Sequence, residues 1–177
     1  MSIFKQLFKS LYSPKYIAAF RMQGIGKTIN YLFFLALLMC VPMIVYLFFY
    51  ITSGNESMRS IIDTKLPVLA ILEGFIADNL ITIPIVLIIY YLLVSFLLFV
   101  KVSIFGAIGL WMTRFMKKRA EYRHIFRMAA YAVTLPSLLI VIIELAGFTL
   151  PAGYLFDWLL TLTILAAATR LLPSRPK

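Results

Sequence analysis

The stretch LITIPIVLIIYYLLVSFLLFVKVSIFGAIGLW occupies residues 80–111, and Lys101 is its one charged residue. An α-helix rises about 1.5 Å per residue and the apolar core of a bilayer is roughly 30 Å thick, so about 20 residues cross it. One straight helix over this stretch would be roughly 48 Å long, too long for a single span at ordinary tilt. We therefore predict a span over residues 80–100, a bend near Lys101 to Gly109, and an interfacial or re-entrant path for residues 101–112.

Small side chains gather in the second half of this stretch, at Ser103, Gly106, Ala107 and Gly109. Small residues let helix backbones approach closely within a membrane. We expect this surface to pack against another helix. Around Gly106 and Gly109 we expect that helix to belong to a partner or to a second copy of the chain.

The composition of the whole chain agrees with a membrane protein. Of its 177 residues, 63% are apolar and 14% are charged, and the mean hydropathy is +0.97. Soluble domains are about half apolar and a quarter charged. Further apolar segments lie at residues 28–51, 128–145 and 154–169. The predicted fold class is therefore all-α, a polytopic bundle of about four transmembrane spans over residues 28–177 behind an N-terminal segment, residues 1–27.

Charge is distributed unevenly among the segments between the spans. The N-terminal segment holds Lys5, Lys9, Lys15, Arg21 and Lys27 and no acid. Residues 112–127 hold Arg114, Lys117, Lys118, Arg119, Arg123 and Arg127 against Glu121 alone. The connection at residues 52–79 holds Arg59 and Lys65 against Glu56, Asp63, Glu73 and Asp78. By the positive-inside rule, both basic segments and both termini are cytoplasmic and the acidic connection is external.

The N-terminal segment has the pattern of an amphipathic helix. Its apolar residues recur at helical spacing with Lys5 and Lys9 between them, and they are Phe4, Leu7, Phe8, Leu11 and Tyr12. We expect residues 1–27 to form an uncleaved interfacial segment in the cytoplasmic leaflet. Within the bundle, Pro42 and Pro136 are expected to kink their helices, either for packing or as a hinge or cavity.

The strongest local feature is the cluster of six basic residues between Arg114 and Arg127. Cations beside a membrane are attracted by anionic lipid, at about 1 kcal/mol each. Orientation and lipid contact are the first interpretation, and docking of an acidic cytosolic partner is the second. In a soluble domain the net charge of +10 would suggest nucleic-acid binding. Here the basic residues lie in segments that flank apolar spans, so we predict no nucleic-acid partner.

Two acidic residues remain at membrane depth, Glu144 and Asp157. We expect them to face each other at the outer rim of a helical hairpin, as a candidate ion or proton site. The alternative is that they reach the outer headgroups or pair with Arg59 or Lys65. Lys101 is expected at the opposite face of the membrane and therefore not as their partner.

Catalytic and cofactor sites are not predicted. One His and one Cys cannot build the ligand sets of zinc or most transition metals, and no G-x-S-x-G nucleophile pattern occurs. Gly24 to Thr28 resembles the end of a phosphate-binding loop, but Arg21 stands where the first glycine is needed. We expect no catalytic residue, no cofactor and no metal.

Three stretches resemble a known family: Ser10-Leu11-Tyr12-Ser13-Pro14-Lys15, Phe20-Arg21-Met22-Gln23-Gly24-Ile25-Gly26-Lys27-Thr28, and Phe126-Arg127-Met128-Ala129-Ala130-Tyr131 followed by Thr134-Leu135-Pro136. They are similar to an uncharacterised membrane-protein family of Gram-positive bacteria. It is a domain of unknown function, distantly grouped with the Yip-type trafficking proteins, and some members are labelled as maltodextrin-utilisation proteins. The resemblance implies a bacterial plasma membrane and a multi-span fold, and it supplies no catalytic residues.

The sequence therefore favours a non-catalytic accessory or scaffold subunit that contacts anionic lipid and docks membrane and cytoplasmic partners. Its partners would be a membrane-protein complex or further copies of itself. The alternative is a small oligomeric transporter or channel that uses Glu144, Asp157 and the proline kinks.

Overall fold

The computed structural model describes residues 3–12, 14–53, 82–118, 120–146, 148 and 153–173. Its elements are α1 (Ile3–Tyr12), α2 (Pro14–Ala19), the 3-10 helix η1 (Phe20–Met22), α3 (Ile25–Met39), α4 (Val41–Ser53), α7 (Thr82–Phe115), α8 (Tyr122–Ala132), α9 (Thr134–Leu145) and α10 (Gly153–Arg170). The described residues contain no β-strand, which confirms the all-α fold class.

Within the described residues, three helical stretches are long and apolar enough to cross a membrane. They cover Ile25–Phe49, Ile83–Phe115 and Tyr122–Leu145. The first joins α3 to α4 and the third joins α8 to α9. α10 has 18 residues that include Asp157 and Arg170, and it is not among the three.

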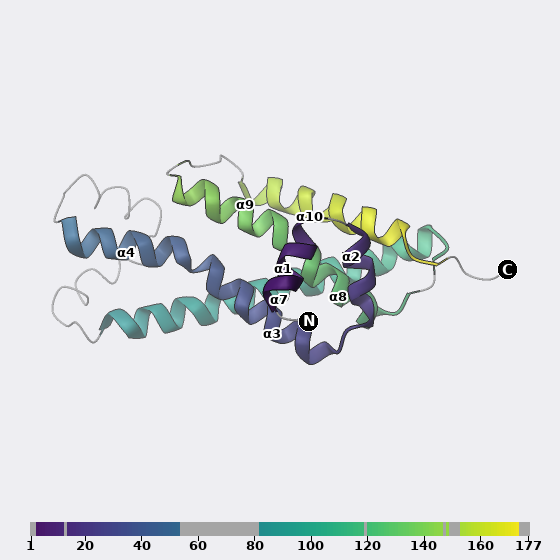
Figure 1. Cartoon of the computed structure of the whole chain (residues 1–177), viewed down its shortest axis with the longest axis horizontal. Helices are drawn as coiled ribbons and strands as arrows, with labels where there is room; N and C mark the ends of the chain where they lie inside the picture. Colours follow the sequence, from purple (N-terminus) through teal and green to yellow (C-terminus); the bar gives the residue numbers. More distant parts are fainter. Residues whose placement is uncertain are drawn as a thin grey trace.

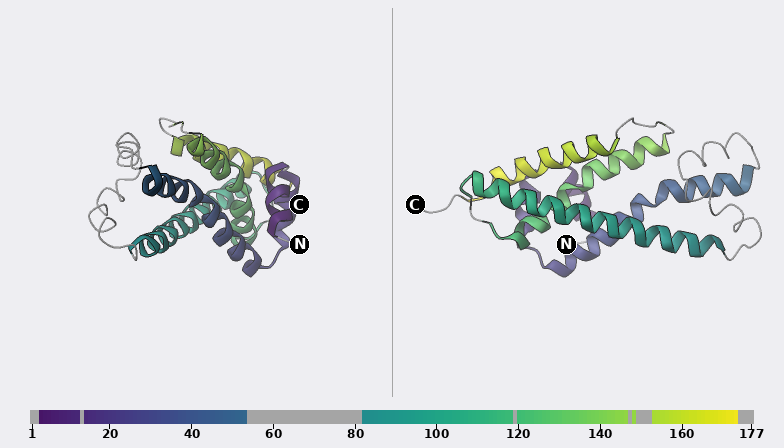
Figure 2. Two further views of the ribbon diagram at one scale, coloured as in Figure 1. Left: turned by 60° about the vertical axis from the view of Figure 1, so that its left-hand side comes forward. Right: turned by 180° about the vertical axis from the view of Figure 1, so that it is seen from behind.

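The predicted bend in residues 101–109 is wrong, because α7 continues without interruption for 34 residues. Figure 2 shows this helix running along most of the molecule. The small residues of this region allow a close approach by neighbouring helices and do not break the helix. Pro84 is tolerated because it is the third residue of α7, where no helical N–H partner is lost.

Interruptions occur next to both prolines that were expected to kink their helices. α3 ends at Met39, before Pro42, and α8 ends at Ala132, before Pro136. Proline lacks the N–H that would bond four residues back, and its ring crowds that carbonyl. The chain nevertheless stays nearly helical, since the amide of Ser137 still donates to the carbonyl of Val133 at 3.1 Å.

Most long helices lie roughly along the long axis of the molecule, whereas α1 and α2 lie across it (Figure 1). The main core forms where these two directions meet, around Tyr31, Leu35, Phe105, Met128 and Leu165. A smaller apolar cluster joins α4 to the beginning of α7 through Met43, Leu47 and Val86. The N-terminal helices therefore belong to the core of the fold.

α7 and α10 run side by side in the same direction. The rings of Phe105 and Trp158 have centroids 5.3 Å apart, and the hydroxyl of Thr169 donates to the sulfur of Met116 at 3.9 Å. Both pairs advance together along the two helices, which defines a parallel register. In this register Asp157 lies three residues beyond the level of Lys101, about 4.5 Å along the axis, a distance that the long lysine side chain spans.

Candidate functional site

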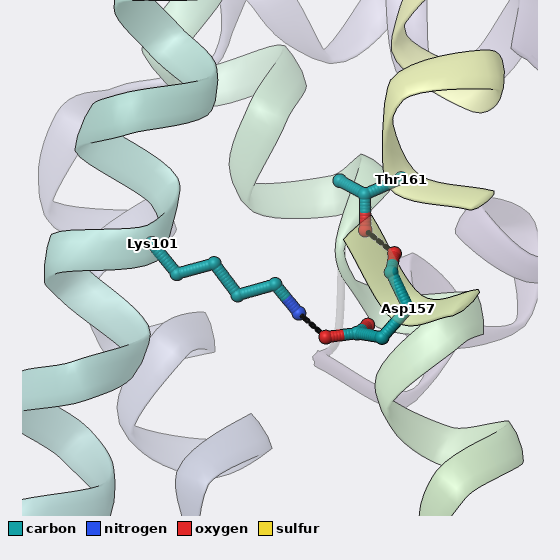
Figure 3. A network of polar contacts seen from close by, with 3 residues as sticks. All are labelled: Lys101, Asp157 and Thr161. Carbon is teal, nitrogen blue, oxygen red and sulfur yellow. Dashed lines mark hydrogen bonds and ion pairs between the residues drawn. The ribbon is translucent and has the colours of Figure 1, made fainter. Parts of the chain in front are cut away.

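An ion pair joins α7 to α10 in the interior of the bundle (Figure 3). The ammonium of Lys101 donates to Oδ2 of Asp157, and the two side chains are only 13% and 11% exposed. The hydroxyl of Thr161 donates to the backbone carbonyl of Asp157 at 2.7 Å, so it does not contact the carboxylate. Among the described residues, Oδ1 of Asp157 has no hydrogen-bond partner. The carboxylate therefore depends on a single cation.

The position of this pair along the helices indicates its depth. Lys101 and Asp157 each precede an arginine of their own helix, Arg114 and Arg170, by 13 residues. This spacing corresponds to about 20 Å of helix. A bilayer with both arginines at its headgroups would enclose the pair in its hydrocarbon core, which is about 30 Å thick. Ionisable residues at such depth are costly and often functional.

The expectation that Lys101 could not partner the membrane acids is wrong. It assumed that α7 bends at Lys101 and that Asp157 stays at the outer rim, whereas the straight α7 and the parallel register bring the two together. The other acid at membrane depth is Glu144, and its described contact involves the backbone and not the carboxylate. The hydroxyl of Tyr46 donates to the backbone carbonyl of Glu144 at 2.5 Å. Glu144 is exposed near the end of α9. Arg59 and Lys65, the alternative partners, lie outside the described residues.

A second polar site fastens α1 to the bundle. The hydroxyl of Tyr31 lies 2.6 Å from Oγ1 of Thr134 and 3.3 Å from Oγ of Ser10. The hydroxyl of Tyr131 lies within hydrogen-bond distance of the Oε1 atoms of Gln6 and Gln23, at 3.1 and 2.9 Å. We call these six residues the tyrosine network.

The orientation of α1 differs from that of a simple amphipathic helix. Gln6 and Ser10 are buried together with Leu7, whereas Phe4 and Phe8 are 64% and 69% exposed. α1 therefore presents polar groups to the bundle and aromatic groups to its surroundings. The apolar pattern with its intervening lysines predicted neither Gln6 nor Ser10 as a buried contact. Their spacing of four residues, on one face of the helix, is the signal that could have identified them.

The basic cluster is divided among different roles. Arg114, Lys117 and Arg123 are exposed, and Lys118 is half-buried. Arg123 forms an exposed ion pair with Glu121, with Nε and Oε2 2.5 Å apart. Arg127 is half-buried and donates from one terminal nitrogen to the backbone carbonyl of Arg21 at 2.9 Å. Arg119 lies outside the described residues.

Lys117, two residues after the end of α7, adopts a conformation that usually requires glycine. Its φ is 52°, and its amide donates to the carbonyl of Arg114 at 3.1 Å. The next amide, that of Lys118, donates to the carbonyl of Thr113 at 2.9 Å. These two bonds are those of a Schellman motif, which turns the chain sharply after a helix. The turn directs the basic segment back toward α8.

Gly106 and Gly109 pack against other helices, as expected, but these helices belong to the same chain. A Cβ atom at Gly109 would lie 2.5 Å from Cγ2 of Ile125 and 3.1 Å from Cδ2 of Leu165. A Cβ atom at Gly106 would lie 3.3 Å from Cε2 of Tyr122. These glycines therefore pack against α8 and α10 of the same chain and are not available to a partner or a second copy.

Comparison with known proteins finds one matching family model, and that family has no known function. The family model described as "Protein of unknown function (DUF1189)" matches residues 4–79 and 71–169. No curated protein and no solved structure matches the chain. Among the described residues, no group of three His, Cys, Asp or Glu side chains could hold a metal ion.

Proposed function

The chain belongs to the DUF1189 family of proteins of unknown function, and from this premise we propose that it is a non-catalytic accessory or scaffold protein of the membrane. Its cytoplasmic face would dock partners and rest on anionic lipid. The contact between Arg127 and the carbonyl of Arg21 carries this proposal, because it joins the two basic segments of the sequence into one face.

The tyrosine network supports the same proposal. It holds α1 through buried side chains, so the N-terminal segment is part of the fold and does not merely float in the leaflet. We place the exposed bases of both segments on this face, and they include Lys15, Lys27, Arg114 and Lys117. The one acid described in this region is Glu121, which pairs with Arg123. Such a face would attract acidic protein surfaces and anionic headgroups.

The proposal includes a topology. Three apolar helical stretches support a membrane location by composition. We propose α10 as the fourth span, with its buried charge neutralised by Lys101, and both termini on the cytoplasmic side. We also propose a bacterial plasma membrane as the location. Gram-positive origin, a distant relation to Yip-type trafficking proteins and a link to maltodextrin utilisation rest on the sequence resemblance alone.

In-cell crosslinking of the tagged full-length protein tests the docking function. Proteins recovered in mild detergent would be identified by mass spectrometry for the wild type and for Lys117→Gln/Lys118→Gln. The matched control is Arg59→Gln/Lys65→Gln, which removes the same charge from the proposed external segment. We expect the first variant alone to lose the recovered partner while its amount in the membrane stays unchanged. Equal recovery from all three proteins would contradict the docking role.

A second candidate function is a small oligomeric transporter or channel. The buried Lys101–Asp157 pair favours it, because charged pairs within membranes often mark ion or proton paths. Flux into liposomes would be measured for the wild type, Asp157→Asn and Glu144→Gln. Loss of flux in Asp157→Asn would support transport, and absence of flux in the wild type with the cations tested would argue against it.

A further inference from the structure

A groove of about 410 Å³ lies where the N-terminal segment meets the end of α10. One side is formed by α2 and η1, and the other by the residues that follow Arg170. Its lining residues are Lys15, Ala18, Ala19, Arg21, Met22, Leu171 and Leu172. The volume is in the range of small-molecule sites, about 300 to 1,000 Å³.

The lining combines two cations with apolar side chains and contains no acid. Lys15 and Arg21 carry the charges, and the small side chains of Ala18 and Ala19 leave the space between them. An arginine can bind phosphate oxygens through two parallel N–H groups, and a lysine adds a mobile positive charge. An occupant of this groove therefore carries a negative charge, of which a phosphate group is the best match.

The edges of the groove favour a lipid over a soluble phosphate compound. Met22 and Leu171 are 76% and 49% exposed, so large apolar surface lies beside the two cations. A soluble anion would leave these side chains uncovered, whereas glycerol and acyl carbons would cover them. The groove also lies next to Arg170, at the end of α10 that we assign to the cytoplasmic surface.

We propose that this groove binds the headgroup of an anionic phospholipid from the cytoplasmic leaflet, with the phosphate between Lys15 and Arg21 and the first acyl carbons against Met22 and Leu171. The backbone at Arg21 is held in place by Arg127, which bonds its carbonyl. This site is distinct from the basic cluster proposed to dock partners, because none of the exposed bases between residues 114 and 123 lines it.

Native mass spectrometry of the full-length protein tests the proposal. The protein would be extracted from vesicles of phosphatidylcholine with one fifth phosphatidylglycerol, and the lipid that remains bound would be counted. We expect one retained phosphatidylglycerol on the wild type. Lys15→Gln/Arg21→Gln should retain it roughly thirtyfold less, because each of the two removed cations attracts anionic lipid by about 1 kcal/mol and about 1.4 kcal/mol corresponds to a tenfold change.

Two further variants separate this site from general attraction to the membrane. Ala19→Phe keeps both charges but fills the groove, and it should also lose the lipid. Lys27→Gln/Arg170→Gln removes two charges from residues of the same face that do not line the groove, and it should retain the lipid.

Three outcomes would overturn the proposal. They are equal retention by all four proteins, equal retention of phosphatidylcholine and phosphatidylglycerol, and displacement of the lipid signal by millimolar inorganic phosphate, which would identify a soluble anion as the ligand. Partner recovery is not measured in this experiment, so its result does not depend on the docking proposal. Circular dichroism of each variant would show that a lost lipid does not reflect a lost fold.

Discussion

The Lys101–Asp157 pair and the tyrosine network both fasten a helix to the bundle, but they use different chemistry. The pair joins α10 to α7 through two formal charges and one contact. The network joins α1 to α3, α8 and α9 through neutral groups and several contacts, such as Tyr31 with Thr134 and Tyr131 with Gln6. The stabilisation at the ion pair therefore comes from a single interaction, whereas the stabilisation at the tyrosine network is distributed over several hydrogen bonds.

This difference predicts different responses to damage. Removing one partner of a buried ion pair leaves an uncompensated charge, whereas removing both can be nearly neutral. Removing one hydroxyl from a neutral network costs only about the net value of a hydrogen bond. A single substitution in the ion pair should therefore cause a large loss of stability, and a single substitution in the tyrosine network should cause a small one.

The largest effect is expected from Lys101→Met, which leaves the carboxylate of Asp157 buried without its cation. Such a change costs about 3 to 5 kcal/mol in free energy of unfolding. Unfolding would be followed by thermal denaturation in a fixed detergent. The double variant Lys101→Met/Asp157→Leu should regain most of the stability, because no isolated charge remains. Equal stability of the single and double variants would show that the unpaired carboxylate of Asp157 is not the cause of the loss.

The next effect tests whether packing, in addition to charge, holds α10 against α7. In Gly109→Ala the new methyl group would meet Ile125 and Leu165, and we expect a loss of about 1 to 3 kcal/mol from overpacking. Gly26→Ala is the matched control, since no atom lies within 4 Å of the position of its Cβ. The control should be neutral or slightly stabilising, because alanine favours helix. If both variants melt with the wild type, close packing at Gly109 does not matter.

A smaller effect is expected in the tyrosine network. Tyr31→Phe removes the hydroxyl between Ser10 and Thr134 and should cost about 1 to 2 kcal/mol. The N-terminal segment should then be cut faster by trypsin while the rest of the bundle resists. Tyr154→Phe is the control, because Tyr154 is largely exposed. A loss as large as that of Lys101→Met would show that the network is no more tolerant than the ion pair.

The smallest effect concerns a charge without a described role in the fold. Lys117→Gly relieves a positive φ at the end of α7 and should stabilise the protein by up to about 1 kcal/mol. Lys118→Gly removes the same charge one residue later and should not stabilise it. A lowered melting temperature in Lys117→Gly would indicate that the lysine side chain contributes more than its backbone strain costs.

Much of the fold could be predicted from the sequence, because lipid imposes simple rules. A long apolar run must be helical, since its backbone groups have no other partners in hydrocarbon. The interruptions before Pro42 and Pro136 follow from the missing proline N–H. The location of the basic residues in two segments is likewise visible in the sequence alone.

The candidate site could not be predicted in the same way. Pairing of Lys101 with Asp157 depends on the parallel register of α7 and α10, which arises from contacts such as Phe105 with Trp158. Hydrophobic pattern assigns a residue to a helix but not to a level against a neighbouring helix. The polar face of α1 was missed for a related reason, because a buried Gln6 is recognisable only once Tyr131 is known to meet it.

The parallel arrangement of α7 and α10 has a consequence for biosynthesis. Asp157 follows Lys101 by 56 residues, and at 5 to 20 residues per second a ribosome needs about 3 to 11 s to add them. Until Asp157 has been added, α7 lacks the counter-ion of its lysine. Its lysine must wait at a watery surface, because an ammonium alone is expensive in hydrocarbon. The final packing of α7 thus depends on α10, which is translated later.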